Sequence, residues 1–169
     1  MEKQMFCYQC EQTAGCSGCT GKAGVCGKTA RTAGLQDELT GALIGLARTC
    51  ASNPKTENTD RLILEGLFAT VTNVNFDDEA IERLIDKVRA EKEQIAPGCA
   101  VCEAKCGNTD EYDMKRIWEA QEDIRSLKSL ILFGIRGMAA YAYHAMVLLY
   151  VDEEVNTYFY KALSILEED

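Results

Sequence analysis

Apolar residues recur at helical spacing along most of this chain. They do so over residues 30–51, 59–72, 77–96 and 152–166, and over a longer stretch from about residue 112 to 150 that is helical with or without a break. The first of these stretches carries its apolar face on Leu35, Leu39, Leu43, Leu46 and Ala47. No strand-like alternation persists, and helices with short connections favour a bundle. The pattern therefore predicts an all-α fold.

Local signals mark where these helices begin and end. Asn53 and Pro54 interrupt the pattern after the first helix, and acidic residues at 77–79 and 152–154 suit the positive end of a helix dipole. Dipole complementarity explains these acidic groups better than metal binding does. The division that we expect is a cysteine-rich loop over residues 1–29 and a helical bundle over 30–169, together forming one domain.

The longest apolar run, residues 130–150, is close to the length that spans a membrane. It contains Arg136 and His144 near its middle, and both are costly in lipid. It also keeps a helical stripe of apolar residues, which indicates a core helix of a soluble bundle: Leu127, Ile131, Ile135, Met138, Ala142, Ala145 and Leu149. We predict no membrane span, and for His144 a core or interface position.

Composition and the N-terminal sequence indicate which classes of partner are disfavoured and which cellular compartment to expect. The chain has 169 residues and a net charge of −9, which disfavours nucleic acid and anionic membranes because both require clustered Lys and Arg. The N-terminus has no apolar segment of a secretory signal, so we expect the cytoplasm. A reducing compartment disfavours disulfides for the nine cysteines and favours metal ligation or redox chemistry.

The cysteines of the first 26 residues carry the candidate chemistry. Cys7, Cys10, Cys19 and Cys26 have the spacing C-x2-C-x8-C-x6-C, in a glycine-rich stretch that also contains Cys16. Soft thiolates select iron–sulfur clusters, zinc or copper(I). The spacing matches neither ferredoxin pattern, and the C-x2-C pairs are close together for structural zinc. The residues favour an iron–sulfur cluster over zinc, and both remain open.

Several segments point to a family. The sequences MFCYQCEQT at 5–13, GCT at 18–20 and GVCGK at 24–28 closely resemble the opening of the hybrid cluster proteins, also called prismane proteins or hydroxylamine reductases. The resemblance continues through AGLQD at 33–37, GLFAT at 66–70, NVNFD at 73–77 and residues 126–144. It covers essentially the whole chain and strengthens the iron–sulfur interpretation.

The resemblance implies that Cys7, Cys10, Cys19 and Cys26 ligate a cubane [4Fe-4S] cluster. The last gap has six residues here, whereas five is common in the family, and a glycine-rich loop can absorb the extra residue. Cys16 is an alternative ligand or a free thiol beside the cluster.

Members of this family are roughly three times as long and carry a second, mixed iron–sulfur–oxygen cluster on later domains. Nothing here matches those ligands, so the chain resembles the N-terminal helical domain, alone or as part of a split protein. We expect an electron-transfer domain without catalytic residues of its own, whose partners are the remaining domains or a separate chain. The alternative is a structural or assembly subunit whose cluster only stabilises the N-terminus.

Two further groups of residues leave alternatives open. Cys99, Cys102 and Cys106 form a second set that the family pattern does not explain: free or redox-active thiols, a second metal site, or a local disulfide. We expect Cys50 to be buried and inert. Arg125, Lys128 and Arg136 form either a solvated helix side or a docking face for an acidic redox donor.

Overall fold

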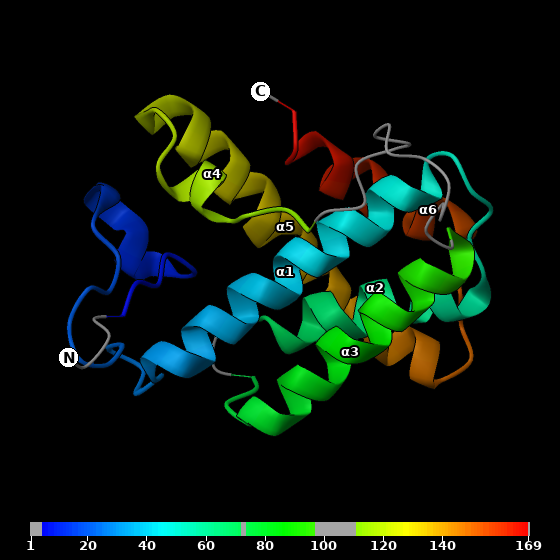
Figure 1. The fold of residues 1–169 in the computed structure, drawn as a ribbon, viewed down its shortest axis with the longest axis horizontal. Helices are drawn as coiled ribbons and strands as arrows, with labels where there is room; N and C mark the ends of the chain where they lie inside the picture. The colour runs from blue at the N-terminus through cyan, green and yellow to red at the C-terminus, as the bar shows by residue number, and fades with distance from the viewer. Residues whose placement is uncertain (1–4, 72–73, 97–110, 169) are drawn as a thin grey trace, which may run out of the picture.

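A computed structural model describes residues 5–71, 74–96 and 111–168. It confirms the all-α class, because regular structure in these ranges is helical apart from two isolated β-bridges. The elements are η1 (Glu11–Cys16), α1 (Ala30–Cys50), α2 (Glu57–Ala69), α3 (Asp78–Ile95), α4 (Lys115–Trp118), α5 (Glu122–Val147) and α6 (Glu153–Ile165). α1 crosses the middle of the molecule and packs against α2, α3 and α6, while α5 packs mainly against α2 (Figure 1).

The core forms around α1, as its apolar spacing predicts. Leu39, Leu43 and Leu46 are fully buried, and α3 contributes Ile81, Ile85 and Val88 from its predicted face. Gly41 faces the segment before α4, where a Cβ would lie 2.2 Å from the carbonyl oxygen of Tyr112. Gly41 therefore lets that segment lie directly on α1.

The predicted helix starts are confirmed by capping hydrogen bonds. The side chain of Asp77 accepts from the backbone N–H of Ala80, and that of Asp152 accepts from those of Glu154 and Val155. Satisfying the free N–H groups of a first turn in this way stabilises a helix by about 1 kcal/mol. Local polar chemistry therefore decides where these helices begin.

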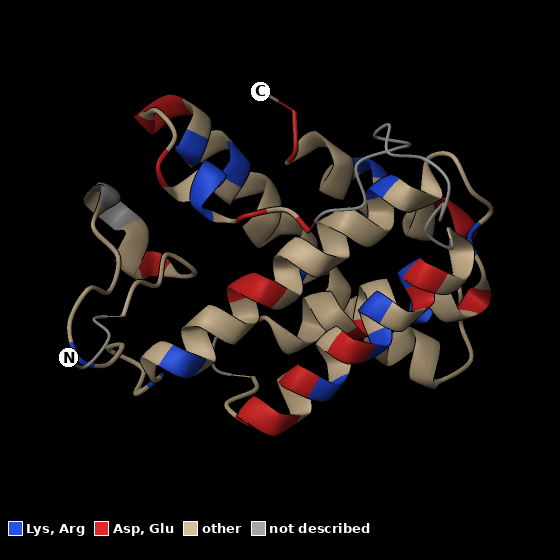
Figure 2. Cartoon of the chain, in the orientation of Figure 1, with Lys and Arg blue, Asp and Glu red and all other residues tan. Residues whose placement is uncertain are grey.

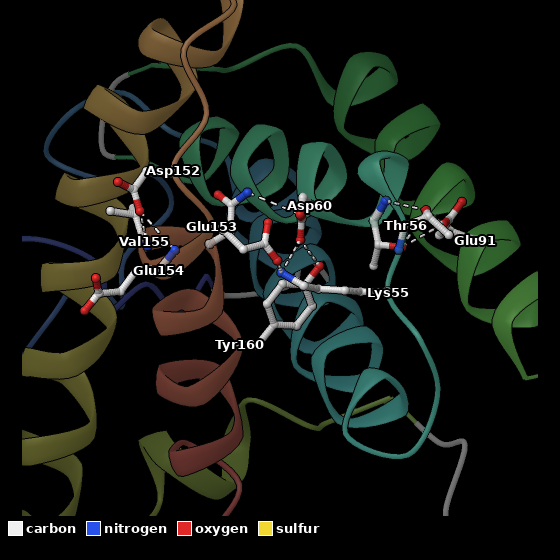
Figure 3. Close-up of polar contacts among 11 residues, drawn as sticks. Lys55, Thr56, Asp60, Glu91, Asp152, Glu153, Glu154, Val155 and Tyr160 are labelled. Carbon is white, nitrogen blue, oxygen red and sulfur yellow. Dashed lines mark hydrogen bonds and ion pairs between the residues drawn. The ribbon is translucent and has the colours of Figure 1, made fainter.

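A polar network joins the N-termini of α2 and α6 to α3 (Figure 3). The Tyr160 hydroxyl donates to Asp60 Oδ1 at 2.7 Å, and Lys55 Nζ lies 2.6 Å from Glu153 Oε1. On the other side of α2, the side chains of Thr56 and Thr59 both donate to Glu91 of α3. These contacts determine how the three helices meet at this end of the bundle.

The orientation of α5 differs from the prediction. Its buried positions are Ser129, Leu132, Ile135, Arg136 and Ala139, whereas Leu127 and Leu149 of the predicted stripe are 60% and 91% exposed. The predicted stripe was therefore wrong at both of its ends and at Met138, which is also exposed. The helix is apolar on two faces, so periodicity alone does not show which face packs inward.

Arg136 also corrects a prediction, because it is buried and not part of a solvated helix side. Its Nε donates to the Thr70 hydroxyl and an Nη to the Thr40 hydroxyl, both at 3.0 Å. Burial lowers the pKa of Arg136 to about 10. In the described part of the chain, α5 is the one helix long and apolar enough to cross a membrane. Arg136 instead ties α5 to the bundle.

Candidate metal centre

The backbone brings Cys7 and Cys19 together. Each donates its N–H to the other's carbonyl oxygen, at 3.0 and 2.9 Å, in an isolated antiparallel bridge. Gly18 makes this pairing possible: its φ is +70°, and a Cβ there would lie 2.7 Å from the Cys7 carbonyl oxygen. Glycine at residue 18 is thus a condition for holding these two cysteines side by side.

Cys10 and Cys26 lie in two separate turns. Cys10 precedes η1 and accepts a backbone hydrogen bond from Thr13, whereas Cys26 lies in a turn closed by the hydrogen bond from Gly27 N to Gly24 O. All four predicted ligands are free thiols. Within the described ranges, no three Cys, His, Asp or Glu side chains lie close enough to hold one metal ion. The assignment of four ligands to one cluster therefore stays a prediction.

Aromatic contacts attach this loop to the bundle. The centroid of the Tyr8 ring lies 5.5 Å from the centroid of the Trp118 ring. It lies 5.4 Å from Cζ of the Arg125 guanidinium. An open cleft of about 1480 Å³ separates the loop from α1 and α4, with Asp37 and Tyr112 in its wall. The loop is the blue segment of Figure 1, which stands beside the first half of α1. The loop is therefore anchored through Tyr8 on one side and open to the cleft on the other.

A buried lysine lies against the first predicted ligand. Lys28 Nζ is 3.9 Å from Cys7 Sγ and donates to Gln9 Oε1 at 3.0 Å and Gln36 Oε1 at 2.5 Å, and its side chain is only 2% exposed. A buried ammonium needs a compensating anion or several acceptors. The sequence analysis did not predict a buried ammonium beside Cys7, although Lys28 ends the segment GVCGK.

A carboxylate and a second cation complete the surroundings. Asp37 accepts from Gln9 Nε2 at 2.7 Å and from Trp118 Nε1 at 3.1 Å, and burial raises its pKa in spite of these hydrogen bonds. Burial also raises the pKa of Cys7, against the charge of Lys28. Arg136 Nη1 has no hydrogen-bond partner in the described part of the chain. Two buried cations thus face one carboxylate, an arrangement that suits an additional anion.

The other cysteines are less informative. Cys50, at the end of α1, is partly buried, and burial raises its pKa to about 11, as expected for an unreactive thiol. Cys99, Cys102 and Cys106 lie outside the described residues, and so does the side chain of Cys16. His144 is exposed on α5, with its ring centroid 5.3 Å from that of Phe68. His144 is therefore not a core residue, and the interface position stays a prediction.

The fold and this loop define the class: a helical bundle that carries a thiol-rich segment before its first helix. Residues 5–169 match the model of the Prismane/CO dehydrogenase family, and the chain belongs to that family. Proteins of this family bind iron–sulfur clusters.

Curated relatives agree with this assignment. A hydroxylamine reductase of Porphyromonas gingivalis (strain W83) is 42% identical over 183 residues, which cover 96% of this chain and 33% of the relative. Hydroxylamine reductases of Methanococcus vannielii and Petrotoga mobilis are 38% and 37% identical, over 98% of this chain and 34% and 36% of their own lengths. The chain thus spans about a third of the length of the curated relatives it matches.

Proposed function

We propose that this chain is the iron–sulfur electron-transfer domain of a hybrid cluster protein, and that Cys7, Cys10, Cys19 and Cys26 ligate one [4Fe-4S] cluster. The observation that carries the proposal is the Cys7–Cys19 pair beside the buried ammonium of Lys28. Neutral thiols give a buried lysine little stabilisation, whereas thiolates on a cluster supply negative charge next to it. The donor set also consists of the soft ligands that such clusters require.

The loop's construction supports binding that is coupled to folding. Gly15, Gly18 and Gly27 have positive φ, so the backbone turns sharply between the cysteines. The free energy of metal binding then contributes to folding, because the unfolded chain has no preformed site. We infer that a cluster held by Cys7, Cys10, Cys19 and Cys26 stabilises the fold of this loop.

A cluster held by four thiolates supplies one-electron transfer. The four cysteines would hold it, and Lys28, positioned by Gln9, would place a positive charge beside it. The relatives are named hydroxylamine reductases, and this chain matches only a third of each. We therefore infer that it passes electrons to the catalytic part that the remaining two thirds of such a protein would form, and that it works in the cytoplasm.

A second candidate function is assembly. α5 and the turn after it expose large apolar side chains, including Leu130, Tyr141 and Leu149. Such a surface favours a subunit that binds the catalytic part of a split protein, with a cluster that only stabilises the loop. The two candidates differ in whether the metal changes its oxidation state during turnover.

The decisive experiment is metal and sulfide analysis of the chain purified without oxygen, with EPR after dithionite reduction. About four irons and four sulfides per chain with a rhombic signal near g = 2 would support the cubane cluster. About eight of each would assign a second cluster to Cys99, Cys102 and Cys106. Zinc without sulfide would contradict electron transfer and leave a stapled structural domain.

A further inference from the structure

One surface of the bundle is apolar and uncovered. It comprises Leu127, Leu130, Met138 and Tyr141 on α5, followed by residues 147–151 at the end of α5 and in the turn to α6 (the α5 surface). All of these side chains are exposed, and the five consecutive residues 147–151 are 60–91% exposed. Isolated exposed apolar residues are ordinary, but contiguous apolar patches on a monomer mark interaction sites.

The spacing on α5 makes this surface continuous. Residues 127, 130, 134, 138 and 141 follow one another at steps of three or four, so they line one side of the helix. Gly134 is part of this line, and a Cβ there would meet nothing within 4 Å. Beyond it, a cavity of about 540 Å³ lies between α5 and α6, with Tyr141, Ala145, Tyr150 and Val155 in its wall. A large side chain of a partner fits such a cavity.

The α5 surface also differs in charge from the rest of the chain. The net charge is −9, yet no Asp or Glu occurs between Leu127 and Val151. Figure 2 shows acidic segments on α3 and at the start of α5, while the second half of α5 carries none. The cores of protein interfaces are depleted of charge in the same way.

The turn contains a costly backbone conformation that keeps one apolar side chain exposed. Leu149 has φ 66°, and the bonds from Leu149 N to Met146 O and from Tyr150 N to Ala145 O form a Schellman motif. Glycine is the usual residue at this position of that motif, because a left-handed Cβ is strained. A leucine that is 91% exposed makes little contact with its own chain. Its side chain is thus available to a partner.

A protein partner explains these features better than a membrane does. Crossing a bilayer would require α5 to break the hydrogen bonds of Arg136 to Thr70 and Thr40 and to expose Leu132, which is fully buried. Helices that lie on membranes instead carry many Lys and Arg beside their apolar face. α5 has only Arg125, Lys128 and the buried Arg136.

The length of the relatives identifies the occupant. They have this domain within chains about three times as long, since the match covers 33–36% of each. We propose that the α5 surface is the docking surface for the polypeptide that forms the other two thirds of these relatives, whether it is joined to this chain or separate. The proposal rests on family membership and on the α5 surface, and it is independent of which metal the cysteines bind.

The test is binding between this chain and the part of the Porphyromonas gingivalis hydroxylamine reductase that lies outside the matched third, produced by co-expression and then separately. We expect a one-to-one complex by light scattering. Leu130→Glu or Leu149→Asp should weaken it at least about 30-fold, the effect of losing one interface hot spot. Phe76→Asp is the matched control, since Phe76 is also exposed but lies before α3, and it should change binding less than about threefold.

Hydrogen exchange keeps the proposal testable if the separate polypeptide fails to fold. In a fusion where this chain replaces the matched third of the relative, amides of residues 147–151 should exchange more slowly than in the isolated chain, while the exposed face of α3 stays unchanged. The proposal would be overturned if residues 147–151 exchanged equally fast in the fusion and in the isolated chain, or if Leu149→Asp left binding unchanged. It would also be overturned if the isolated chain bound itself or lipid vesicles and Leu149→Asp abolished that binding. Metal analysis of the same samples tests the proposed cluster separately.

Discussion

Lys28 Nζ lies 3.9 Å from Cys7 Sγ, and two glutamine side chains hold the ammonium in this position. Because Lys28 is almost fully buried, little water screens its charge. A fixed positive charge beside a ligand sulfur stabilises the more negative, reduced state of a cluster. Lys28 therefore connects the packing of the loop to the redox chemistry that we propose.

Lys28→Met should lower the midpoint potential of the cluster. At an effective dielectric constant of ~20, a charge about 5 Å away contributes roughly 50–150 mV after partial screening. The measurement is an EPR-monitored redox titration of protein whose iron content has first been shown to match the wild type. Lys22→Met, an exposed lysine in the same loop, is the control and should shift the potential by far less. Equal potentials in all three proteins would contradict a role for Lys28.

Replacing single predicted ligands should separate them from the other cysteines. Cys26→Ser should reduce bound iron by more than half, because the cluster would keep only three thiolates. Cys50→Ser should leave the iron content unchanged, since Cys50 lies at the far end of α1 from the loop. Iron and sulfide assays on proteins purified without oxygen would measure both. Normal iron in Cys26→Ser together with loss in Cys16→Ser would transfer the ligand assignment to Cys16.

Glu91 should make stability depend on acid pH. Burial opposes its ionisation, but hydrogen bonds from Thr59, Asn58 and Thr56 outweigh burial and lower its pKa in the folded state. The ionised Glu91 therefore stabilises the folded state fully at pH values above its pKa in the unfolded chain, about 4.3. This stabilisation is lost as the pH falls through the lower pKa of the folded state. We expect Glu91→Gln to reduce the free energy of unfolding at pH 7 by about 1–3 kcal/mol.

Urea denaturation followed by circular dichroism at pH 7 and pH 4 would measure this effect. The difference in the free energy of unfolding between Glu91→Gln and the wild type should be smaller at pH 4 than at pH 7. Glu79→Gln is the control, because Glu79 is highly exposed and its ion pair with Arg83 contributes little. A difference that stays constant with pH would show that the carboxylate charge is not what stabilises the folded state.

Leu149→Gly should stabilise the isolated chain while removing a contact of the α5 surface. Relief of the left-handed strain should raise the free energy of unfolding by about 1 kcal/mol. Leu148→Gly is the matched control: Leu148 is also exposed but has φ −87°, so glycine there should lower stability by about 0.5–1 kcal/mol. Thermal or urea unfolding would distinguish them. If Leu149→Gly destabilises the chain as Leu148→Gly does, the leucine contributes to folding and not to docking.

The helices were predictable because their signals are local. The buried face of α1 follows from the spacing of Leu35, Leu39 and Leu43, and Asp77 and Asp152 mark helix starts through contacts within three residues. The face of α5 was not predictable in this way. That helix has apolar residues on two sides, and its buried cation, Arg136, finds its partners on α1 and just after α2.

The sequence by itself determined the helical class, the starts of α3 and α6, the family and the set of thiols that could hold a metal. All of these depend on residue type and on spacing over a few turns. Only the tertiary structure decided that Lys28 is buried against Cys7, 21 residues away, and that Leu149 and its neighbours remain uncovered. The physical reason is that burial depends on which distant segments pack together, and spacing along one helix does not specify that.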